Sequence, residues 1–400
     1  MDDARSEATT SNIGQLPDRI AALPEHERAL ANRLFSIVAS EGAIVPPPEM
    51  YPWLERTFGS IDATLRQRIV RVTNRWTFEG ATFNPLRSRR PGSGSTPHHG
   101  ELAPEIAQRI AASEGDDFCD PDHKTPADTF GRVRGRHIVT SANAAKADGW
   151  HAVGIFDRHD PLAIDADLIA DILETAGEWA ARAHQADPAA HHFFLLWNCL
   201  WRSGASQTHG HVQMTLSAAM PHARVALWRA AADRYHRETG GDYFTDLAAV
   251  HRALGLSTAT GDDFADDKVE RFASLTPSKE REIVLLAPTY AAGALDPAEP
   301  ATLAEPLAAT ILAALDTLGV RSFNLAVFGP PFSSSDAQAA DWNDFPIVAR
   351  FVDRGNLLSS TSDIAALELF GSSVVATDPF DLARTLRSAE ASPTDDGGEL

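Results

Sequence analysis

The chain has 400 residues, of which 44% are hydrophobic, enough to bury one or two sizeable cores. Its formal net charge of −20 argues against general binding to nucleic acid or to an anionic membrane, and its two cysteines, Cys119 and Cys199, give no disulfide framework. The N-terminus lacks an apolar leader and no apolar run reaches about 18 residues, so we expect a cytoplasmic protein without a membrane partner.

The N-terminal part of the chain is expected to be helical. Within ERALANRLFSIVAS, the apolar residues Leu30, Leu34, Phe35 and Val38 recur at helical spacing. The prolines of PPPEMYPW then interrupt the helix, because prolines in series cannot continue it. We therefore assign residues 1–75 to an N-terminal helical extension that begins with a polar tail.

Short strands around one long helix follow from about residue 69 onward. Residues 84–100 are rich in Pro, Gly, Ser and Arg and form a loop. A helix is expected from Asp165 to His184, because apolar residues recur on one of its faces. The expected strands are the alternating or densely apolar segments IVRVTNRWTF, HIVTSA, HAVGIFD, HHFFLLWNCLW and HGHVQMTLS.

The second half of the chain repeats this order. A helix covers about 220–240, REIVLLAP is a strand, ATLAEPLAATILAALDTLG is a helix, and RSFNLAVFG and FPIVARFVD are strands. The pattern predicts an α+β fold built from two halves, each an antiparallel or mixed sheet with helices. We place a catalytic first half at residues 76–220 and a second, degenerate half at 221–388, followed by a disordered tail at 389–400.

The segment with the clearest chemistry is NCLWRSGASQTHGHVQ, residues 198–213. His209, His211 and Gln213 alternate along an expected strand, so their side chains should share one face. The small residues of SGAS let a phosphate approach backbone N–H groups. Two structural histidines would by themselves explain the alternation. The small-residue loop and Gln213 favour a nucleophilic histidine instead, because they could hold a phosphoryl group beside it. A neutral imidazole can attack phosphorus and form a phosphoramidate.

SGASQTHGHVQ resembles the signature of the galactose-1-phosphate uridylyltransferase branch of the histidine-triad superfamily, which includes the dinucleoside tetraphosphate phosphorylases. In that branch a glutamine replaces the third histidine, as Gln213 does here. The resemblance implies that His211 is the nucleophile and that Gln213 and Ser206 are catalytic. Asn198 and Ser206 precede His211 by 13 and 5 residues, as the family's pattern requires.

Other segments extend the resemblance over roughly residues 80–385. FNPLRSRRP resembles a family segment that holds substrate phosphates, although a solvated loop would also explain its arginines. TSANAAKADGWHAVGIFDRHDPL resembles a strand pair with an Asn near the nucleotide, and RSFNLAVF resembles the family's C-terminal Phe-Asn strand. The substrate-binding residues that the resemblance implies are Asn198, Gly204, Ala205, Gln207, Arg87, Asn84 and Asn143.

Many members of this family bind zinc through a Cys-x-x-Cys pair and two histidines. Here the pair has become Asp116 and Cys119, while His159 and His209 match the two histidine positions. Either Asp116 replaces the missing thiolate as an oxygen ligand, which zinc accepts, or the metal has been lost. FPIVARFVDRG lacks the histidine pair that family members carry there, so we expect no second metal site.

The resemblance implies a homodimeric nucleotidyltransferase of the hexose-1-phosphate uridylyltransferase kind. It would move a nucleoside monophosphate between a nucleotide sugar and a sugar phosphate through a covalent nucleotidyl-histidine. Gln207 stands where uridylyltransferases often have Asn, which leaves open a phosphorylase that acts on a dinucleoside polyphosphate or an NDP-hexose with inorganic phosphate. A non-catalytic nucleotide-binding protein is a second alternative.

Overall fold

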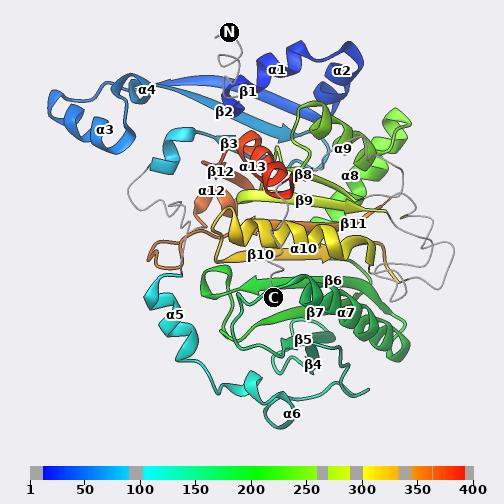
Figure 1. The fold of residues 1–400 in the computed structure, drawn as a ribbon. Coiled ribbons are helices and arrows are strands. Elements are labelled where there is room, and N and C mark those ends of the chain that lie inside the picture. The colour runs from blue at the N-terminus through cyan, green and yellow to red at the C-terminus, as the bar shows by residue number, and fades with distance from the viewer. Residues whose placement is uncertain are drawn as a thin grey trace, which may run out of the picture.

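The fold is taken from a computed structural model that describes residues 12–89, 102–258, 269–288, 301–332, 342, 345–362 and 364–391 (Figure 1). Most of the loop predicted at 84–100, and all of the predicted tail after residue 391, lie outside the described residues. The start of that tail, residues 389–391, belongs to the last helix rather than to a coil.

The N-terminal extension contains two strands as well as helices. Strand β1 (Phe35–Ala43) pairs along its whole length with the antiparallel strand β2 (Arg66–Asn74). Strands β3 (Gly80–Phe83) and β12 (Ser372–Val375) complete a four-stranded sheet in the order β1-β2-β3-β12. The prediction of a helix over residues 35–43 was therefore wrong, because pairing with β2 satisfies that backbone and buries Phe35 against the core.

One eight-stranded sheet runs through both halves of the chain. Its order is β4-β5-β7-β6-β10-β11-β9-β8, and each strand is antiparallel to its neighbours. The α+β fold in two halves is confirmed, with the halves joined where β6 pairs with β10. The strands are β4 (Ile138–Ala142), β5 (Trp150–Phe156), β6 (Ala190–Cys199), β7 (His211–Ala218), β8 (Glu270–Ala273), β9 (Glu280–Ala287), β10 (Phe323–Phe328) and β11 (Ile347–Asp353).

Helices cover one face of this sheet in both halves (Figure 1). The long helix predicted from Asp165 is α7 (Ala166–Ala186), which Asp165 caps by accepting a hydrogen bond from the Leu168 N–H. It packs against α10 (Ala301–Asp316), and both helices contribute to one core with the sheet. In the described ranges, no helix is long and apolar enough to cross a membrane.

The opposite face is covered mainly over the second-half strands. There α8 (Ala223–Thr239), α9 (Tyr243–Ala253) and the N-terminal helices form a second core with β9, β10 and β11. Side chains on this face at the junction of the halves, such as Asn198 and Asn324, are only half-buried. The candidate site lies at this junction.

The other helices connect or flank these layers. The α-helices are α1 (Leu16–Ala22), α2 (Glu25–Leu34), α3 (Tyr51–Phe58), α4 (Ile61–Leu65), α5 (Pro104–Ala111), α6 (Pro121–Lys124), α12 (Ala366–Leu369) and α13 (Pro379–Ala391). The 3-10 helices are η1 (Ile13–Gln15), η2 (Pro48–Met50), η3 (Pro85–Arg89), η4 (Asp117–Cys119) and η5 (Trp201–Ser203).

The second core contains a neutral histidine that should make the fold sensitive to acid. His251 on α9 donates from Nδ1 to the Leu247 carbonyl, accepts at Nε2 from the Leu275 N–H, and stacks on Phe272. Burial lowers the pKa of His251 to about 4, from an ordinary value of 6.5. Its neutral form therefore stabilises the fold above pH 6.5, and this stabilisation is lost as the pH falls from 6.5 towards 4.

We expect this histidine alone to lower the free energy of unfolding by about 3 kcal/mol across that pH range. The variant His251→Phe keeps a ring against Phe272 but loses both hydrogen bonds of the imidazole, so it should be less stable at neutral pH. Because phenylalanine cannot titrate, the variant should also be less sensitive to acid. Denaturant unfolding of both proteins at several pH values measures the difference. Equal pH slopes for wild type and variant would show that His251 does not carry the effect.

Candidate active site

The loop between β6 and β7 carries the residues that the signature singles out. After Cys199 the chain turns through η5, and Gly204 adopts a left-handed conformation with φ of +100° that favours glycine. Strand β7 begins at His211, so His209 precedes the strand instead of lying on it as predicted. Gly210 separates the two histidines because a Cβ there would lie 2.5 Å from Cδ2 of Phe156.

The same loop presents a row of backbone donors. The N–H of Gly204 bonds to the Trp201 carbonyl and that of Ala205 to the Leu200 carbonyl. The next four N–H groups, from residues 206 to 209, donate to no other residue of the described ranges. Consecutive unpaired N–H groups form a concavity that suits an anion such as a phosphate. The predicted substrate contacts Gly204, Ala205, Ser206 and Gln207 all lie along this loop and are exposed or half-buried.

His211 is held in one tautomer by the backbone. Its Nδ1 lies 2.8 Å from the His209 carbonyl oxygen, which can only accept, so Nδ1 carries the proton. Burial lowers the pKa of His211, which keeps the ring neutral and leaves the lone pair on Nε2. The edge of the Phe118 ring packs against the imidazole, with the ring centroids 5.4 Å apart. The orientation suits a nucleophilic Nε2.

Gln213 is oriented by a histidine that the sequence analysis did not single out. His151 on β5 accepts the Ala147 N–H at Nδ1, at 2.9 Å, so the ring proton lies on Nε2. That Nε2 donates to Oε1 of Gln213 at 3.0 Å, which turns the glutamine NH2 group away from the histidine. The predicted Asn143 lies beside His151, because its backbone N–H donates to the His151 carbonyl at 2.9 Å, while its Nδ2 only makes a contact of 3.3 Å with Nε2.

Asn198 and Asn324 face each other across the junction of the halves. They are paired residues of β6 and β10, and Nδ2 of Asn324 donates to Oδ1 of Asn198 at 2.6 Å. Nδ2 of Asn198 makes no hydrogen bond within the described part of the chain, so it remains a donor. Asn198 therefore lies at the end of β6 from which the loop of residues 200–210 begins, and its role as a substrate contact stays a prediction.

The structure does not connect Asn84 with this group of residues. Its amide donates to Oε1 of Gln67 and accepts from the N–H of Leu86, so both ends serve the turn into η3. Arg87 follows in the same 3-10 helix and is half-buried. The roles of Asn84 and Arg87 in holding substrate stay predictions.

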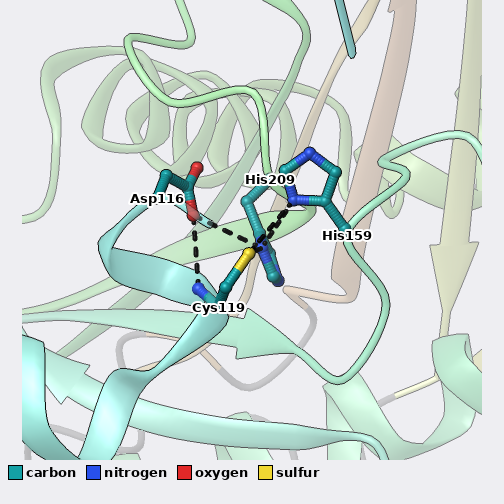
Figure 2. Close-up of side chains that lie close together, drawn as sticks. All are labelled: Asp116, Cys119, His159 and His209. Atoms are coloured by element: carbon teal, nitrogen blue, oxygen red, sulfur yellow. Dashed lines mark hydrogen bonds and ion pairs between the residues drawn. The ribbon is translucent and has the colours of Figure 1, made fainter. Parts of the chain in front are cut away.

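Beside His211, four side chains gather in the arrangement of a metal site (Figure 2). The two histidine Nδ1 atoms of His159 and His209 are 3.2 Å apart, and Sγ of Cys119 lies 3.4 Å from each. Oδ1 of Asp116 lies 3.6 Å from Nδ1 of His209. Tetrahedral zinc with its usual bond lengths places nitrogen and sulfur ligands roughly 3.3 to 3.5 Å from one another. The two nitrogens and the sulfur are thus already spaced for a tetrahedral ion, and all four ligand atoms lie within 4.8 Å of one another.

The Nε2 atoms of His159 and His209, which point away from the cluster, are hydrogen-bonded to backbone carbonyls. His209 Nε2 lies 2.9 Å from the Phe156 carbonyl, and His159 Nε2 lies 3.0 Å from the Ile110 carbonyl and 3.1 Å from Oγ of Ser113. Because a carbonyl can only accept, each Nε2 carries the proton and each Nδ1 lone pair points into the cluster. Metal-bound histidines are usually oriented in this way.

Asp116 and Cys119 complete the fit. Oδ1 of Asp116 accepts the N–H groups of Phe118 and Cys119, which caps η4, whereas its buried Oδ2 has no partner among the described residues. Desolvation raises the pKa of the Cys119 thiol, and a cation bound beside it would favour the thiolate. An Asp, Cys, His, His set fits zinc, and in the described ranges no other such cluster of possible ligands is found.

Comparisons with known proteins identify the fold. No family model matches the chain, and no curated protein matches its sequence. Solved structures do match. An ADP-glucose phosphorylase from Arabidopsis thaliana with bound ADP-glucose is 16% identical, with a TM-score of 0.58 over 79% of this chain and 97% of its own.

A GalT-like protein from Arabidopsis thaliana is 17% identical, with a TM-score of 0.55 over 69% of this chain and 92% of its own. A uridylyltransferase is 16% identical, with a TM-score of 0.53 over 79% of this chain and 97% of its own. At such identities the likeness establishes the fold alone. The chain therefore shares the fold of these phosphorylase, GalT-like and uridylyltransferase structures, as the resemblance of its signature predicted.

Proposed function

We propose that the protein is a nucleotidyltransferase that transfers a nucleoside monophosphate from a nucleotide sugar by way of a covalent nucleotidyl-His211. The observation that carries the proposal is the fixed tautomer of His211, whose Nδ1 is held by the His209 carbonyl while Nε2 keeps its lone pair. The N–H groups of residues 206–209 and the NH2 group of Gln213, which have no partner among the described residues, lie on the flanking loop and strand. Together they supply a nucleophile and donors for a phosphoryl group.

The transfer would take place in two displacements. In the first, Nε2 of His211 attacks the α-phosphorus, a P–N bond forms, and the P–O bond to the phosphate-bearing leaving group breaks. The ring then carries a positive charge, which the hydrogen bond from Nδ1 to the His209 carbonyl stabilises. In the second, a phosphate oxygen of the acceptor attacks the same phosphorus and the P–N bond breaks. Gln213, Asn198 and the loop donors hold the non-bridging oxygens in both steps.

Zinc bound by Asp116, Cys119, His159 and His209 would supply structural rigidity. Its effect on the reaction would be indirect, since His209 provides the carbonyl that fixes His211. The residues of the chain itself perform both displacements.

The acceptor distinguishes two versions of the proposal. A hexose-1-phosphate acceptor makes the protein a uridylyltransferase-like enzyme, and inorganic phosphate makes it a phosphorylase. Gln207 favours the phosphorylase version, and one structure of the same fold is an ADP-glucose phosphorylase with bound ADP-glucose. We retain the transfer between nucleotide sugar and sugar phosphate as the first version and the phosphorylase as the second candidate.

Intact-protein mass spectrometry tests both versions. Wild-type protein would be incubated at neutral to alkaline pH, where a phosphoramidate survives, with UDP-glucose, ADP-glucose, GDP-mannose or diadenosine tetraphosphate. We expect a mass gain of one nucleoside monophosphate on the peptide that contains His211, and the added mass identifies the base. Chasing the adduct with glucose 1-phosphate or with inorganic phosphate then identifies the acceptor. Binding of a donor by calorimetry without any adduct would instead support a non-catalytic nucleotide-binding protein.

A further inference from the structure

The second half of the chain reaches the candidate site through Asn324. This residue lies on β10, two strands away from the nucleophile, and its side chain makes three hydrogen bonds. Nδ2 donates to Oδ1 of Asn198 at 2.6 Å and to the Ser203 carbonyl at 3.0 Å, and Oδ1 accepts from Nη1 of Arg354. Both N–H groups of the Asn324 amide and one lone pair of its Oδ1 are in use, so Asn324 has no side-chain donor left for a substrate phosphate.

The orientation of the Asn324 amide is fixed by partners whose roles cannot change. The guanidinium of Arg354 can only donate, so it must face Oδ1. The backbone carbonyl of Ser203 can only accept, so it must face Nδ2. Because Nδ2 of Asn324 therefore also faces Asn198, the latter must present Oδ1 to it and turn its own NH2 group to the other side.

The same contacts hold the loop that follows Asn198. Arg354 lies 3.4 Å from the Ser203 carbonyl, and Arg202 donates to the carbonyls of Arg354 and Thr361 at 2.9 and 2.8 Å. Trp201 donates to the Leu357 carbonyl at 3.1 Å. The turn that leads into the loop of residues 204–209, which we propose binds the phosphate, is thus anchored on the second half of the chain.

We propose that Asn324 is a positioning residue that acts through Asn198, holding the Asn198 amide so that its NH2 group is the end offered to the nucleotide phosphate. The proposal rests on the proposed function for the identity of that ligand. It gives the second half of the chain, expected from the sequence to be a degenerate copy, a direct part in the site.

The isosteric change Asn324→Asp tests this role. The carboxylate still pairs with Arg354, but it can only accept, so Asn198 must rotate to donate to it and turn its own Oδ1 toward the phosphate. We expect the second-order rate of adduct formation with the donor that labels wild type to fall about 10- to 100-fold, as for a lost hydrogen bond to a charged group. In an Asn198→Ala background the same change should have little further effect, since two residues that act as a unit are not additive.

Asn356→Asp is the matched control. It adds the same charge on the turn that follows Arg354, and its side-chain oxygen can still accept the N–H of Leu358 as Asn356 does at 2.9 Å. Its labelling rate should stay within about twofold of wild type, as for a surface change. Asn324→Ser serves as a second variant if the aspartate unfolds, because it removes the NH2 donor without adding charge.

A spectroscopic measurement separates this proposal from the proposed function. The side-chain amide protons of Asn198, assigned by their loss in Asn198→Asp, should move downfield and exchange more slowly in Asn324→Asp, because the carboxylate accepts one of them. Unchanged Asn198 resonances, or an unchanged labelling rate in Asn324→Asp, would overturn the positioning role. If no donor labels wild type, the proposed function fails, and the resonances alone decide the role of Asn324.

Discussion

Replacing Gln213 by glutamate should lower the rate of nucleotidyl transfer by about 10³-fold or more while the fold persists. The two side chains have nearly the same shape, and His151 Nε2, now 3.0 Å from Oε1, can donate to a carboxylate oxygen as it does to the amide. The other carboxylate oxygen would then replace the NH2 group. A donor to the phosphoryl oxygens becomes a negative charge facing them, so the transition state loses a hydrogen bond and gains repulsion.

Single-turnover labelling with the donor that modifies wild type measures this loss, and thermal unfolding verifies the fold. Gln108→Glu is a suitable control, because it makes the same change on an exposed position of α5. The control separates the effect of one more negative charge on a chain of net charge −20 from the effect at the site. If the labelling rate of the Gln213→Glu protein is within tenfold of the wild-type rate, Gln213 does not take part in catalysis.

The sequence predicted those parts of the site that local periodicity encodes. The apolar face of α7 and the alternation of His211 and Gln213 on β7 follow from the spacing of side chains along a helix or strand. The place of His209 is not contained in the local pattern. Strand β7 begins only at His211, and the side chains that gather around His209, those of Asp116, Cys119 and His159, come from distant segments of the chain.

Two other features depend on strand register. His151 is a single polar residue in the apolar segment GWHAVGIF, and its role is evident only once β5 pairs with β7, which sets it opposite Thr215 and diagonal to Gln213. The continuous sheet arises in the same way, because no local pattern shows that β6 pairs with β10. The strand over residues 35–43 was missed for a related reason, since a short apolar run fits a helix or a strand until its partner β2 is known.

Removing zinc should destabilise the protein substantially. We expect one zinc per chain by elemental analysis, held by Asp116, Cys119, His159 and His209. An ion that binds the folded chain alone, at a free concentration a thousand times its dissociation constant, adds about 4 kcal/mol to the free energy of unfolding. Treatment with a strong chelator should therefore lower this free energy by about that amount, and added zinc should restore it.

Two substitutions show whether these four side chains hold the ion. In Asp116→Asn the amide oxygen can still accept the N–H groups of Phe118 and Cys119, so η4 keeps its cap while the site loses one anionic ligand. Zinc content should fall in Asp116→Asn, and the variant should respond less to chelation than wild type. Cys199→Ala is the control, because that cysteine is buried in the main core away from the cluster. Wild-type protein that is folded, free of zinc and indifferent to both chelator and added zinc would mean that the four side chains form a hydrogen-bonded cluster in place of a metal site.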